Sequence, residues 1–323
     1  MSEIMIMGEL LCEIMRPSED VELYEIGEFR GPFPSGAPGI FASTAARLGC
    51  STGIIAGVGN DDLGKNITDR LEAVGVDCSR ILKSGKGATG VAFVTYYSNG
   101  DRKFIFHINN TPAVEPKAPA DLKGMEDTKY FHIMGCSLMS SLEFGWEILK
   151  TMHMFRKQGT RISFDPNVRL EMMRDPKVLD IVQEAFQNSN IFMPGVSELK
   201  MITGKESVEE AISTAFGNEE LEILVLKNGS KGSEVYTRKG LELKMGVYPV
   251  KQLDATGAGD SFDAAFICGL VQGKSLREAA QMGAAAGALN AAAFGPMEGL
   301  ISPETVEKIR EIGYKLYETR WAE

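Results

Sequence analysis

The most informative segment of the chain is Leu253-Asp254-Ala255-Thr256-Gly257-Ala258-Gly259-Asp260-Ser261-Phe262. Its small residues come just before an apolar stretch, residues 264–271, in which we expect a helix. Small residues at the start of a helix leave the first backbone N–H groups open to an anion, and the helix dipole adds partial positive charge there. The segment therefore predicts an anion-binding helix start with the Asp260 carboxylate in its first turn.

Other interpretations of this segment have to be weighed. A glycine-rich helix start with an acidic first turn also occurs as ordinary helix capping. A dinucleotide-binding GxGxxG motif would follow the first strand of a βαβ unit, whereas these glycines lie near the C-terminal fifth of the chain, and the absence of GxxxxGK[ST] excludes a P-loop. In a phosphoryl-transfer site, Asp260 would stand beside the γ-phosphate and take a proton from an attacking hydroxyl.

Length and composition predict a globular protein that binds neither nucleic acid nor membranes. The chain has 323 residues, 44% of them apolar, and its net charge is -10 from 44 acidic and 34 basic residues. Nucleic-acid binding would need a basic stripe, and no basic run occurs. Five scattered cysteines and only three histidines argue against zinc and favour reduced thiols near a core. Because there is no signal peptide and no apolar run of about 20 residues, we expect a soluble, cytoplasmic protein.

Short apolar runs alternate with segments of helical period along most of the chain. Apolar residues repeat at helical spacing from Leu63 to Val74 and indicate a helix that ends at Gly75. Strands are predicted at residues 4–7, 53–56, 130–134, 161–164, 190–193 and 223–226, and further helices at 141–157, 176–188, 208–216, 257–271, 276–293 and 303–316. This alternation predicts an α/β fold, a mostly parallel sheet flanked by helices on both faces.

Two stretches interrupt this alternation. Residues 12–36 contain three prolines and little helical period, and residues 89–108 hold two β runs joined by Ser98-Asn99-Gly100-Asp101. Asn-Gly between two such runs is a strong hairpin signal. We expect residues 12–36 and 89–113 to form a small β lid, and residues 1–11, 37–88 and 114–323 to form the α/β domain. A sheet that projects beside a cleft can close over a ligand.

Three blocks of the sequence resemble the PfkB family of carbohydrate kinases. Residues 254–260, DATGAGD, are similar to the family's C-terminal signature DTxGAGD. Residues 36–49, followed by 57–64, resemble its N-terminal block, and Phe164-Asp165-Pro166-Asn167-Val168-Arg169 resembles its central DPNxR. The blocks occur in the family's order and span nearly the whole chain. The resemblance implies a ribokinase-like fold, in which a sugar binds between a large α/β domain and a small β-sheet lid.

The resemblance also implies roles for residues that match the family's motifs. Asp260 would be the catalytic base, and the backbone N–H groups of Gly257, Ala258 and Gly259 would bind the transferring phosphate. Glu198 would organise hydrated Mg²⁺. Asp254 would help hold a monovalent cation such as K⁺, together with carbonyls near Gly295.

Further residues are implied on the nucleotide and sugar sides. Those expected to bind ATP are Lys227, Gly229 and Gly232, which face the nucleotide, and Asn290, which flanks the adenine. Those expected to contact the sugar are Glu13, Gly36, Arg102, His107, Asn109, Asp165, Asn167 and Arg169. From residue type alone, Glu13 is equally a solvated strand-end carboxylate, and Arg169 is equally part of a structural ion pair. A turn charge such as Arg102 more often faces solvent than binds a ligand.

Three positions depart from the family pattern. Ile40 replaces the sugar-binding asparagine of the GGxxxN block, Gly195 replaces the asparagine of the NxxE motif, and Glu13 replaces an early strand aspartate. The first and third departures concern the sugar, and the second concerns Mg²⁺ and phosphate. None of the three departures falls at Asp260 or in residues 254–259, called here the glycine loop.

Together these observations predict an ATP-dependent sugar kinase acting on a ketohexose of the fructose or tagatose type. His107 stands near the position where 2-keto-3-deoxygluconate kinases carry an arginine for the substrate carboxylate, which favours a neutral sugar. The alternatives are a 2-keto-3-deoxygluconate kinase, a less favoured nucleoside kinase, and a non-catalytic ligand sensor on the same fold, suggested by Ile40 and Gly195. An exposed lid edge would also favour a homodimer through the lid.

Overall fold

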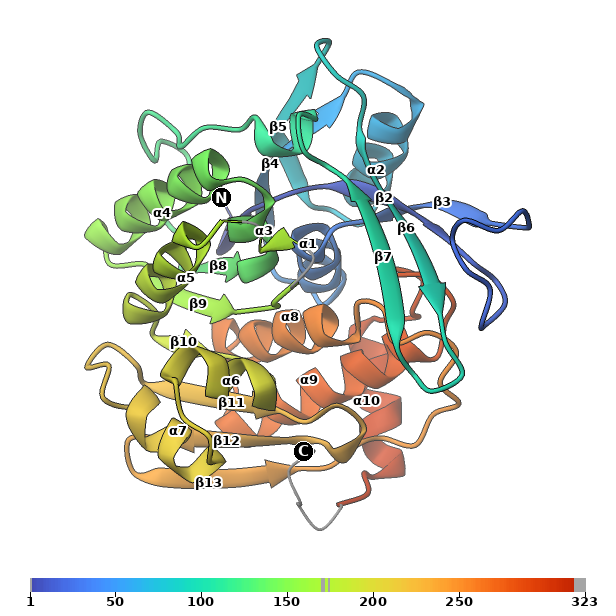
Figure 1. Ribbon diagram of the computed structural model, residues 1–323. Helices are drawn as coiled ribbons and strands as arrows, with labels where there is room; N and C mark the ends of the chain where they lie inside the picture. Colours follow the sequence, from blue (N-terminus) through green and yellow to red (C-terminus); the bar gives the residue numbers. More distant parts are fainter. Residues whose placement is uncertain (1, 170–171, 174, 317–323) are drawn as a thin grey trace.

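The computed structural model describes residues 2–169, 172–173 and 175–316 (Figure 1). A nine-stranded sheet crosses it in the order β13-β12-β11-β10-β9-β8-β1-β4-β5. Strands from β11 to β5 pair in parallel, and β12 and β13 add antiparallel pairs at one edge. The predicted, mostly parallel sheet is confirmed. Its strands are β1 (Ile4–Met7), β4 (Thr52–Gly59), β5 (Asp77–Ser84), β8 (Tyr130–Met134), β9 (Arg161–Asp165), β10 (Ile191–Phe192), β11 (Ile223–Lys227), β12 (Ser233–Thr237) and β13 (Gly240–Met245).

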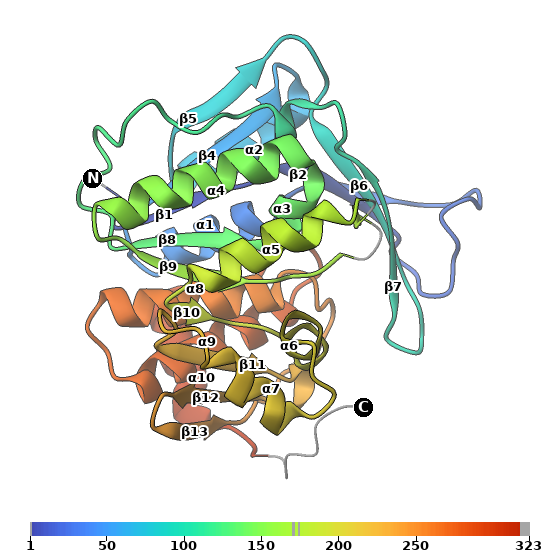
Figure 2. The ribbon, with the colours of Figure 1, turned by 60° about the vertical axis from the view of Figure 1, so that its left-hand side comes forward.

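Helices cover both faces of this sheet (Figures 1 and 2). One face carries α1 (Ala37–Arg47), α2 (Asp62–Ala73), α8 (Ala258–Val271), α9 (Leu276–Ala291) and α10 (Pro303–Ile312). The other carries α3 (Gly135–Ser140), α4 (Leu142–Lys157), α5 (Lys177–Gln187), α6 (Val196–Thr203) and α7 (Val208–Ala215). Strand β1 serves both cores, because Ile4 and Ile6 point to the first and Met5 and Met7 to the second.

A four-stranded sheet projects beside the large one, in the order β3-β2-β6-β7 (Figure 2). Its strands are β2 (Leu11–Met15), β3 (Arg30–Ser35), β6 (Gly90–Tyr96) and β7 (Arg102–His107). The β6–β7 turn contains Gly100 at φ 91°, a conformation that glycine adopts easily. Residues 8–10 are all that separate β2 from β1, so the small sheet is tied to the middle of the large one.

Some elements differ from those expected. The last helix ends at Ile312, short of residue 316, because Gly313 takes φ 82°. Helix α1 is not among the expected helices, since residues 38–45 are buried all round and show no amphipathic period. Strands β5 and β13 are missed because they carry several exposed polar residues.

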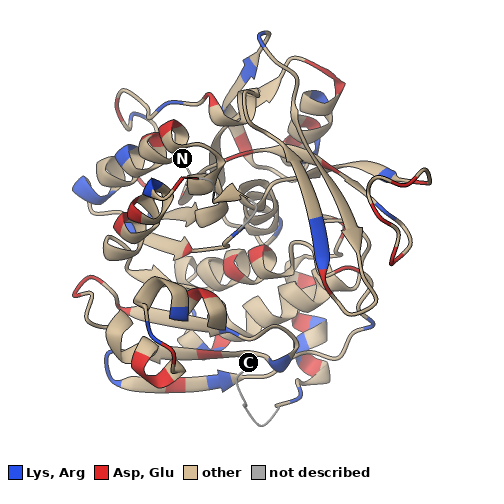
Figure 3. Ribbon diagram, in the orientation of Figure 1, with Lys and Arg blue, Asp and Glu red and all other residues tan. Residues whose placement is uncertain are grey.

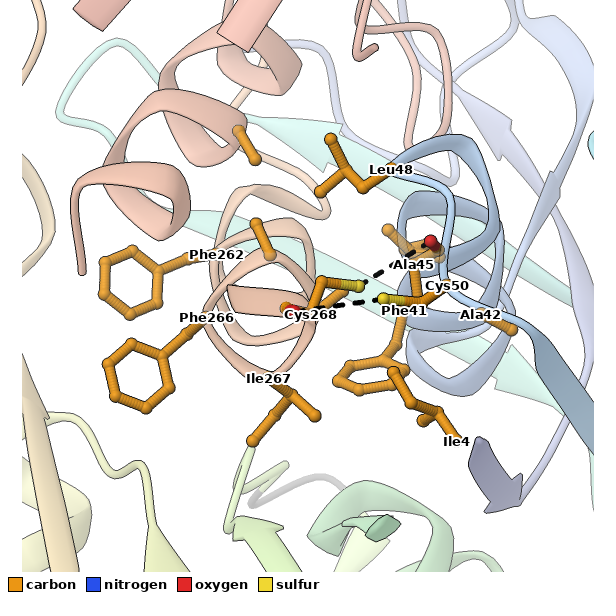
Figure 4. Packing of buried hydrophobic residues seen from close by; sticks show 14 of the residues in the cluster. Ile4, Phe41, Ala42, Ala45, Leu48, Cys50, Phe262, Phe266, Ile267 and Cys268 are labelled. Carbon is orange, nitrogen blue, oxygen red and sulfur yellow. Dashed lines mark hydrogen bonds between the residues drawn. The ribbon is translucent and has the colours of Figure 1, made fainter. Parts of the chain in front are cut away.

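Helix α8 rests on a packed core. Figure 4 shows Cys268 of α8 pointing toward Ala45 of α1 and toward Cys50. The Cys268 thiol donates to the Ala45 carbonyl at 3.6 Å, and the Cys50 thiol donates to the Cys268 carbonyl at 3.9 Å. These contacts hold the second half of α8, the helix that carries Asp260, against α1 and the residues that follow α1.

Charged residues are spread over the ribbon with both signs interspersed (Figure 3). In the described part of the chain, no helix is both long and apolar enough to cross a membrane.

Candidate active site

The carboxyl ends of the parallel strands and the small sheet enclose a cavity of about 220 Å³, called here the inner cavity. Open α/β sheets place their ligands at this end of the strands. The residues implicated by sequence that line the inner cavity are Glu13, Gly36, Arg102, Asp165, Asn167, Arg169, Glu198, Lys227, Gly257, Gly259 and Asp260. An apolar wall faces them, formed by Leu11, Ile40, Phe104, Phe106 and Ile108.

Asp260 lies in the first turn of α8 and is buried. Asn167 Nδ2 donates to Asp260 Oδ1 at 2.9 Å, and Asn167 itself takes the left-handed φ of 39°. Burial raises the pKa of Asp260 to about 7, and the charge of Asp165 adds to the rise. A carboxylate with such a pKa can accept a proton near neutral pH.

The glycine before α8 is required by space as well as by conformation. Gly257 has φ 76°, and a Cβ at this position would lie 2.5 Å from the carbonyl oxygen of Pro296. Gly257 and Gly259 line the inner cavity. The N–H of Ala258 donates a hydrogen bond to the carbonyl of Ala255 at 3.3 Å. Of the three N–H groups expected to bind phosphate, this one therefore already has a partner within the protein.

Lys227 is held by two carboxylates close to the start of α8. Lys227 Nζ is 2.9 Å from Asp165 Oδ2 and 2.8 Å from Asp263 Oδ2. Burial by itself would lower the pKa of Lys227, but the charges of the two aspartates outweigh it and raise the pKa. Lys227 therefore carries a fixed positive charge. Asp263 was not implicated by sequence; its position three residues after Asp260, in an apolar helix, is the signal that points to it.

One carboxylate oxygen of Glu13 accepts a hydrogen bond and the other accepts none from the described residues. Ser35 Oγ donates to Oε1 at 2.6 Å, whereas Oε2 is buried and has no hydrogen-bond partner among the described residues. Burial raises the pKa of Glu13 to about 7. Beside it, Gly36 has no room for a side chain, because a Cβ would lie 2.5 Å from the Glu9 carbonyl. An unpartnered buried acceptor that faces a cavity is suited to bind a ligand hydroxyl.

Glu9 lines the same cavity and was not implicated by sequence. It lies two residues after the end of β1, is 4% exposed, and accepts hydrogen bonds from Ser137 Oγ and Cys136 Sγ. Burial raises its pKa. An acidic residue inside an apolar run at a strand end is the signal that could have identified it.

A second cavity of about 390 Å³ adjoins the inner cavity. Gly229 and Gly232 line it, as expected of a nucleotide site, and Ala258, Gly287 and Ala288 leave room between the helices. Three residues line both cavities: Lys227, Ala255 and Gly259. The two cavities therefore meet at the start of α8.

Three residues expected in the site lie elsewhere. His107 is exposed and its ring contacts Phe93, because in β7 the residues 102, 104 and 106 face the inner cavity and the odd-numbered residues face away. Asn109 lines a different, outer hollow. Asn290 is buried and donates to the Thr256 carbonyl at 2.7 Å, so it braces the glycine loop and does not line the second cavity.

Asp254 ties the glycine loop to the small sheet. Its Oδ1 accepts from Tyr96 Oη and from Thr256 N, both at 2.9 Å, and its Oδ2 accepts from Gly295 N at 3.0 Å. The structure thus brings Asp254 and Gly295 together as expected. All three donors are neutral, so they leave the negative charge of this carboxylate in place, and the monovalent cation stays a prediction.

The comparisons with known proteins bear on the whole chain. The model of the pfkB family carbohydrate kinases matches residues 1–303. This chain belongs to the pfkB family. It is therefore a carbohydrate kinase, an enzyme that transfers a phosphoryl group to an alcohol group of a sugar.

Relatives of this pfkB kinase include enzymes named for two different sugars. It is 28% identical over 318 residues to a probable fructokinase-5 of Arabidopsis thaliana, covering 94% of this chain and 95% of the relative. It is 30% identical over 287 residues to 2-dehydro-3-deoxygluconokinase of Bacillus subtilis, covering 87% of each. A provisionally named Ribokinase II from E. coli, solved with ATP and Mg²⁺, superposes with a TM-score of 0.90 at 36% identity, over 97% of this chain and 100% of that one. The ribokinase-like fold is confirmed.

Proposed function

We propose that this pfkB kinase transfers the γ-phosphate of ATP to a hydroxyl group of a small sugar, with Asp260 as the base. The observation that carries the proposal is the junction of two cavities at Lys227, Ala255 and Gly259, with Asp260 on the side of the inner cavity. The E. coli relative with bound ATP and Mg²⁺ supports assigning the second cavity to the nucleotide. The inner cavity then holds the sugar.

In the proposed step, the sugar hydroxyl lies against Asp260, whose Oδ1 is held by Asn167. The hydroxyl oxygen forms a bond to the γ-phosphorus while the bond from that phosphorus to the β,γ-bridging oxygen breaks. The electron pair of the broken bond leaves with ADP, and the hydroxyl proton passes to Asp260. Backbone N–H groups at the start of α8 and the charge of Lys227 stabilise the negative charge of the transferring group.

Mg²⁺ fits this site through Glu198. Its Oε1 accepts from Val168 N and its Oε2 from Gly195 N, each at 2.7 Å, which leaves lone pairs for the water ligands of a hydrated ion. Mg²⁺ in such sites is bound by one or two carboxylates together with substrate phosphates and water. A cluster of three ligating side chains is therefore not required, and the described residues contain no such cluster. When bound, Mg²⁺ would neutralise charge on the β- and γ-phosphates.

Two sugar classes compete for the inner cavity. The fructokinase relatives favour a ketohexose of the fructose or tagatose type. A second candidate, 2-keto-3-deoxygluconate, is favoured by one specific observation: Arg102 and Arg169 both line the cavity, where guanidinium groups could bind a carboxylate. The exposed position of His107 removes the argument from that residue for a neutral sugar.

A coupled assay of ADP release with MgATP tests the proposal against a panel of ketoses, aldoses, sugar acids and nucleosides. We expect turnover that depends on one class of sugar and is far faster than ATP hydrolysis without sugar. Preference for a sugar acid would assign Arg102 and Arg169 to its carboxylate. ATP binding without turnover of any sugar would contradict the proposal and favour a ligand sensor on the same fold.

Replacing Glu13 with glutamine should raise the KM for the sugar about 10- to 100-fold, because a hydrogen bond to a charged group contributes about 1.5–3 kcal/mol. The KM for ATP should not change, since Glu13 does not line the second cavity. Steady-state kinetics at varied sugar and at varied ATP separate the two. Glu28→Gln, at an exposed position between β2 and β3, is the matched control and should leave both values unchanged. An unchanged sugar KM in Glu13→Gln would remove Glu13 from the site.

The small sheet serves as a lid in this proposal. Tyr96 of β6 contacts Asp254, and Arg102 of β7 lies 3.5 Å from the Thr256 hydroxyl, so both lid strands touch the glycine loop. Closure would exclude water and limit ATP hydrolysis. Exposed side chains on the lid, Phe29 and Ile105, support a homodimer through this sheet. The cytoplasm remains the expected compartment.

A further inference from the structure

Asp263 is a buried acid to which the proposed transfer assigns no role of its own. It lies in α8, one turn after Asp260, and is fully buried in a mostly apolar helix. Its Oδ2 is 2.8 Å from Lys227 Nζ, whereas its Oδ1 has no hydrogen-bond partner among the described residues. Because burying a carboxyl group is costly, such a residue beside a cleft is a candidate for a functional role.

Asp263 completes a ring of polar contacts that begins and ends on α8. Asn167 Nδ2 donates to Asp260 Oδ1 at 2.9 Å, and Asn167 N donates to Asp165 Oδ1 at 3.1 Å. Lys227 Nζ donates to Asp165 Oδ2 at 2.9 Å and to Asp263 Oδ2 at 2.8 Å. The ring closes because Asp260 and Asp263, three residues apart, lie on one side of the same helix. It therefore fixes the Lys227 ammonium group relative to the Asp260 carboxylate.

The ring leaves one donor of Lys227 for a ligand. An ammonium group has three N–H donors, and Asp165 and Asp263 accept from two of them. Lys227 lines both cavities, and its Nζ lies 3.9 Å from where a Cβ of Gly259 would be. With two of three tetrahedral donors fixed, the direction of the third is fixed as well. At this junction of the cavities, the third donor can reach the transferring phosphate.

One carboxylate alone would not fix the Lys227 ammonium group in this way. With Asp165 as the only partner, the group could turn about a single contact, because the lysine stem is flexible. The second contact comes from a different element, α8, and removes that freedom. Burial raises the pKa of Asp263 despite the charge of Lys227, but Oδ2 can accept a hydrogen bond whether the group is protonated or ionised.

We propose that Asp263 is a positioning residue for phosphoryl transfer, because it sets the direction in which Lys227 donates to the transferring phosphate. This inference rests on the proposed kinase function and adds to it a residue that touches neither substrate. Asp263 is not among the residues that line either cavity, so it would act on the rate through Lys227.

Replacing Asp263 with alanine tests this assignment by steady-state kinetics. The substrates are MgATP and the best acceptor among the ketoses, aldoses, sugar acids and nucleosides of the coupled assay. We expect kcat to fall about 10- to 100-fold, while the KM values for ATP and for the acceptor stay within a factor of about 3. The two effects separate because the direction of the Lys227 donor matters most in the transition state.

Glu234→Gln is the matched control for the loss of a buried acid. Glu234 is buried, forms an ion pair with Lys244, and is not among the residues that line either cavity. This variant should lose stability but keep its kcat. A kcat for Asp263→Ala equal to that of the control would overturn the inference and leave the kinase function standing. An unmodified enzyme that turns over none of the acceptors would overturn both.

A double-mutant cycle with Lys227 provides a readout that a merely structural role would not move. In Lys227→Met the ammonium group is absent, so adding Asp263→Ala should change kcat by less than a factor of about 3. A further loss of about 10-fold or more would show that Asp263 acts independently of Lys227, and would overturn the inference.

Asp263→Asn keeps the test decisive if the alanine variant does not fold. Asparagine keeps the shape of the side chain but gives Lys227 a weaker, uncharged acceptor, so kcat should fall about 3- to 10-fold at unchanged KM values. An unchanged kcat in a folded Asp263→Asn enzyme would contradict the positioning role.

Discussion

Asp260→Asn is expected to lower kcat by about 10³- to 10⁴-fold while ATP binding persists. Asparagine has nearly the same shape but cannot take up the hydroxyl proton at neutral pH. Its amide nitrogen or oxygen would still face Asn167, so the turn at the start of α8 should be kept. Coupled ADP release measures kcat, and equilibrium titration with a fluorescent ATP analogue measures nucleotide binding.

A matched control is available in another helix. Asp180 lies in the first turn of α5 and is exposed, so Asp180→Asn makes the same chemical change far from the inner cavity. It should leave kcat within a factor of about 2, as surface changes usually have small effects. A kcat for Asp260→Asn close to that of the unmodified enzyme would show that Asp260 is not the base.

The rate should also depend on pH with a known sign. The pKa of Asp260 is raised to about 7, so below this pH the carboxyl is protonated in the free enzyme and cannot accept another proton. We therefore expect kcat/KM to fall as the pH decreases through about 7. Glu13 has a pKa of about 7 as well, so the profile should be repeated with Glu13→Gln. Loss of the pH dependence in that variant would assign it to Glu13 instead of Asp260.

Lys227→Met should have the largest effect on stability. Removing the ammonium group leaves Asp165 and Asp263 buried without their cation, and breaking a buried ion pair in this way costs about 3–5 kcal/mol. Activity should fall too, because Lys227 lies where the two cavities meet. The free energy of unfolding from urea titration is the measurement.

Two further variants interpret the result for Lys227. Lys308→Met removes an exposed ion pair with Glu304 and should cost less than about 1 kcal/mol. Adding Asp263→Asn to Lys227→Met replaces one of the two carboxyl groups by an amide that can donate a hydrogen bond to Asp165, so the double variant should regain part of the stability but not the activity. A cost below about 1 kcal/mol for Lys227→Met would show that Asp165 and Asp263 do not depend on this lysine.

Much of the fold and part of the candidate site could be predicted from local sequence. The glycine-rich start of α8, the hairpin at Asn99-Gly100 and the alternation of strands with helices each depend on neighbouring residues only. Residues at the carboxyl ends of parallel strands, such as Asp165, collect at one edge of the sheet whatever the details of packing. The resemblance to the PfkB family implied site roles for Glu13, Asp165, Asn167 and Asp260, and all four line the inner cavity.

Only the tertiary structure decided which groups meet and which face of a strand they share. Lys227, at the end of β11, reaches Asp165, at the end of β9, across the short strand β10 that lies between them. It reaches Asp263 because α8 packs across this part of the sheet. Arg102 faces the cavity and His107 does not, since a strand alternates its side chains and a shift of one residue exchanges its two faces. The sequence alone thus determined most of the elements and the chemistry of the glycine-rich helix start, but not elements without a local pattern such as α1. Contacts between elements distant in sequence depend on strand order, register and helix packing, which no local pattern encodes.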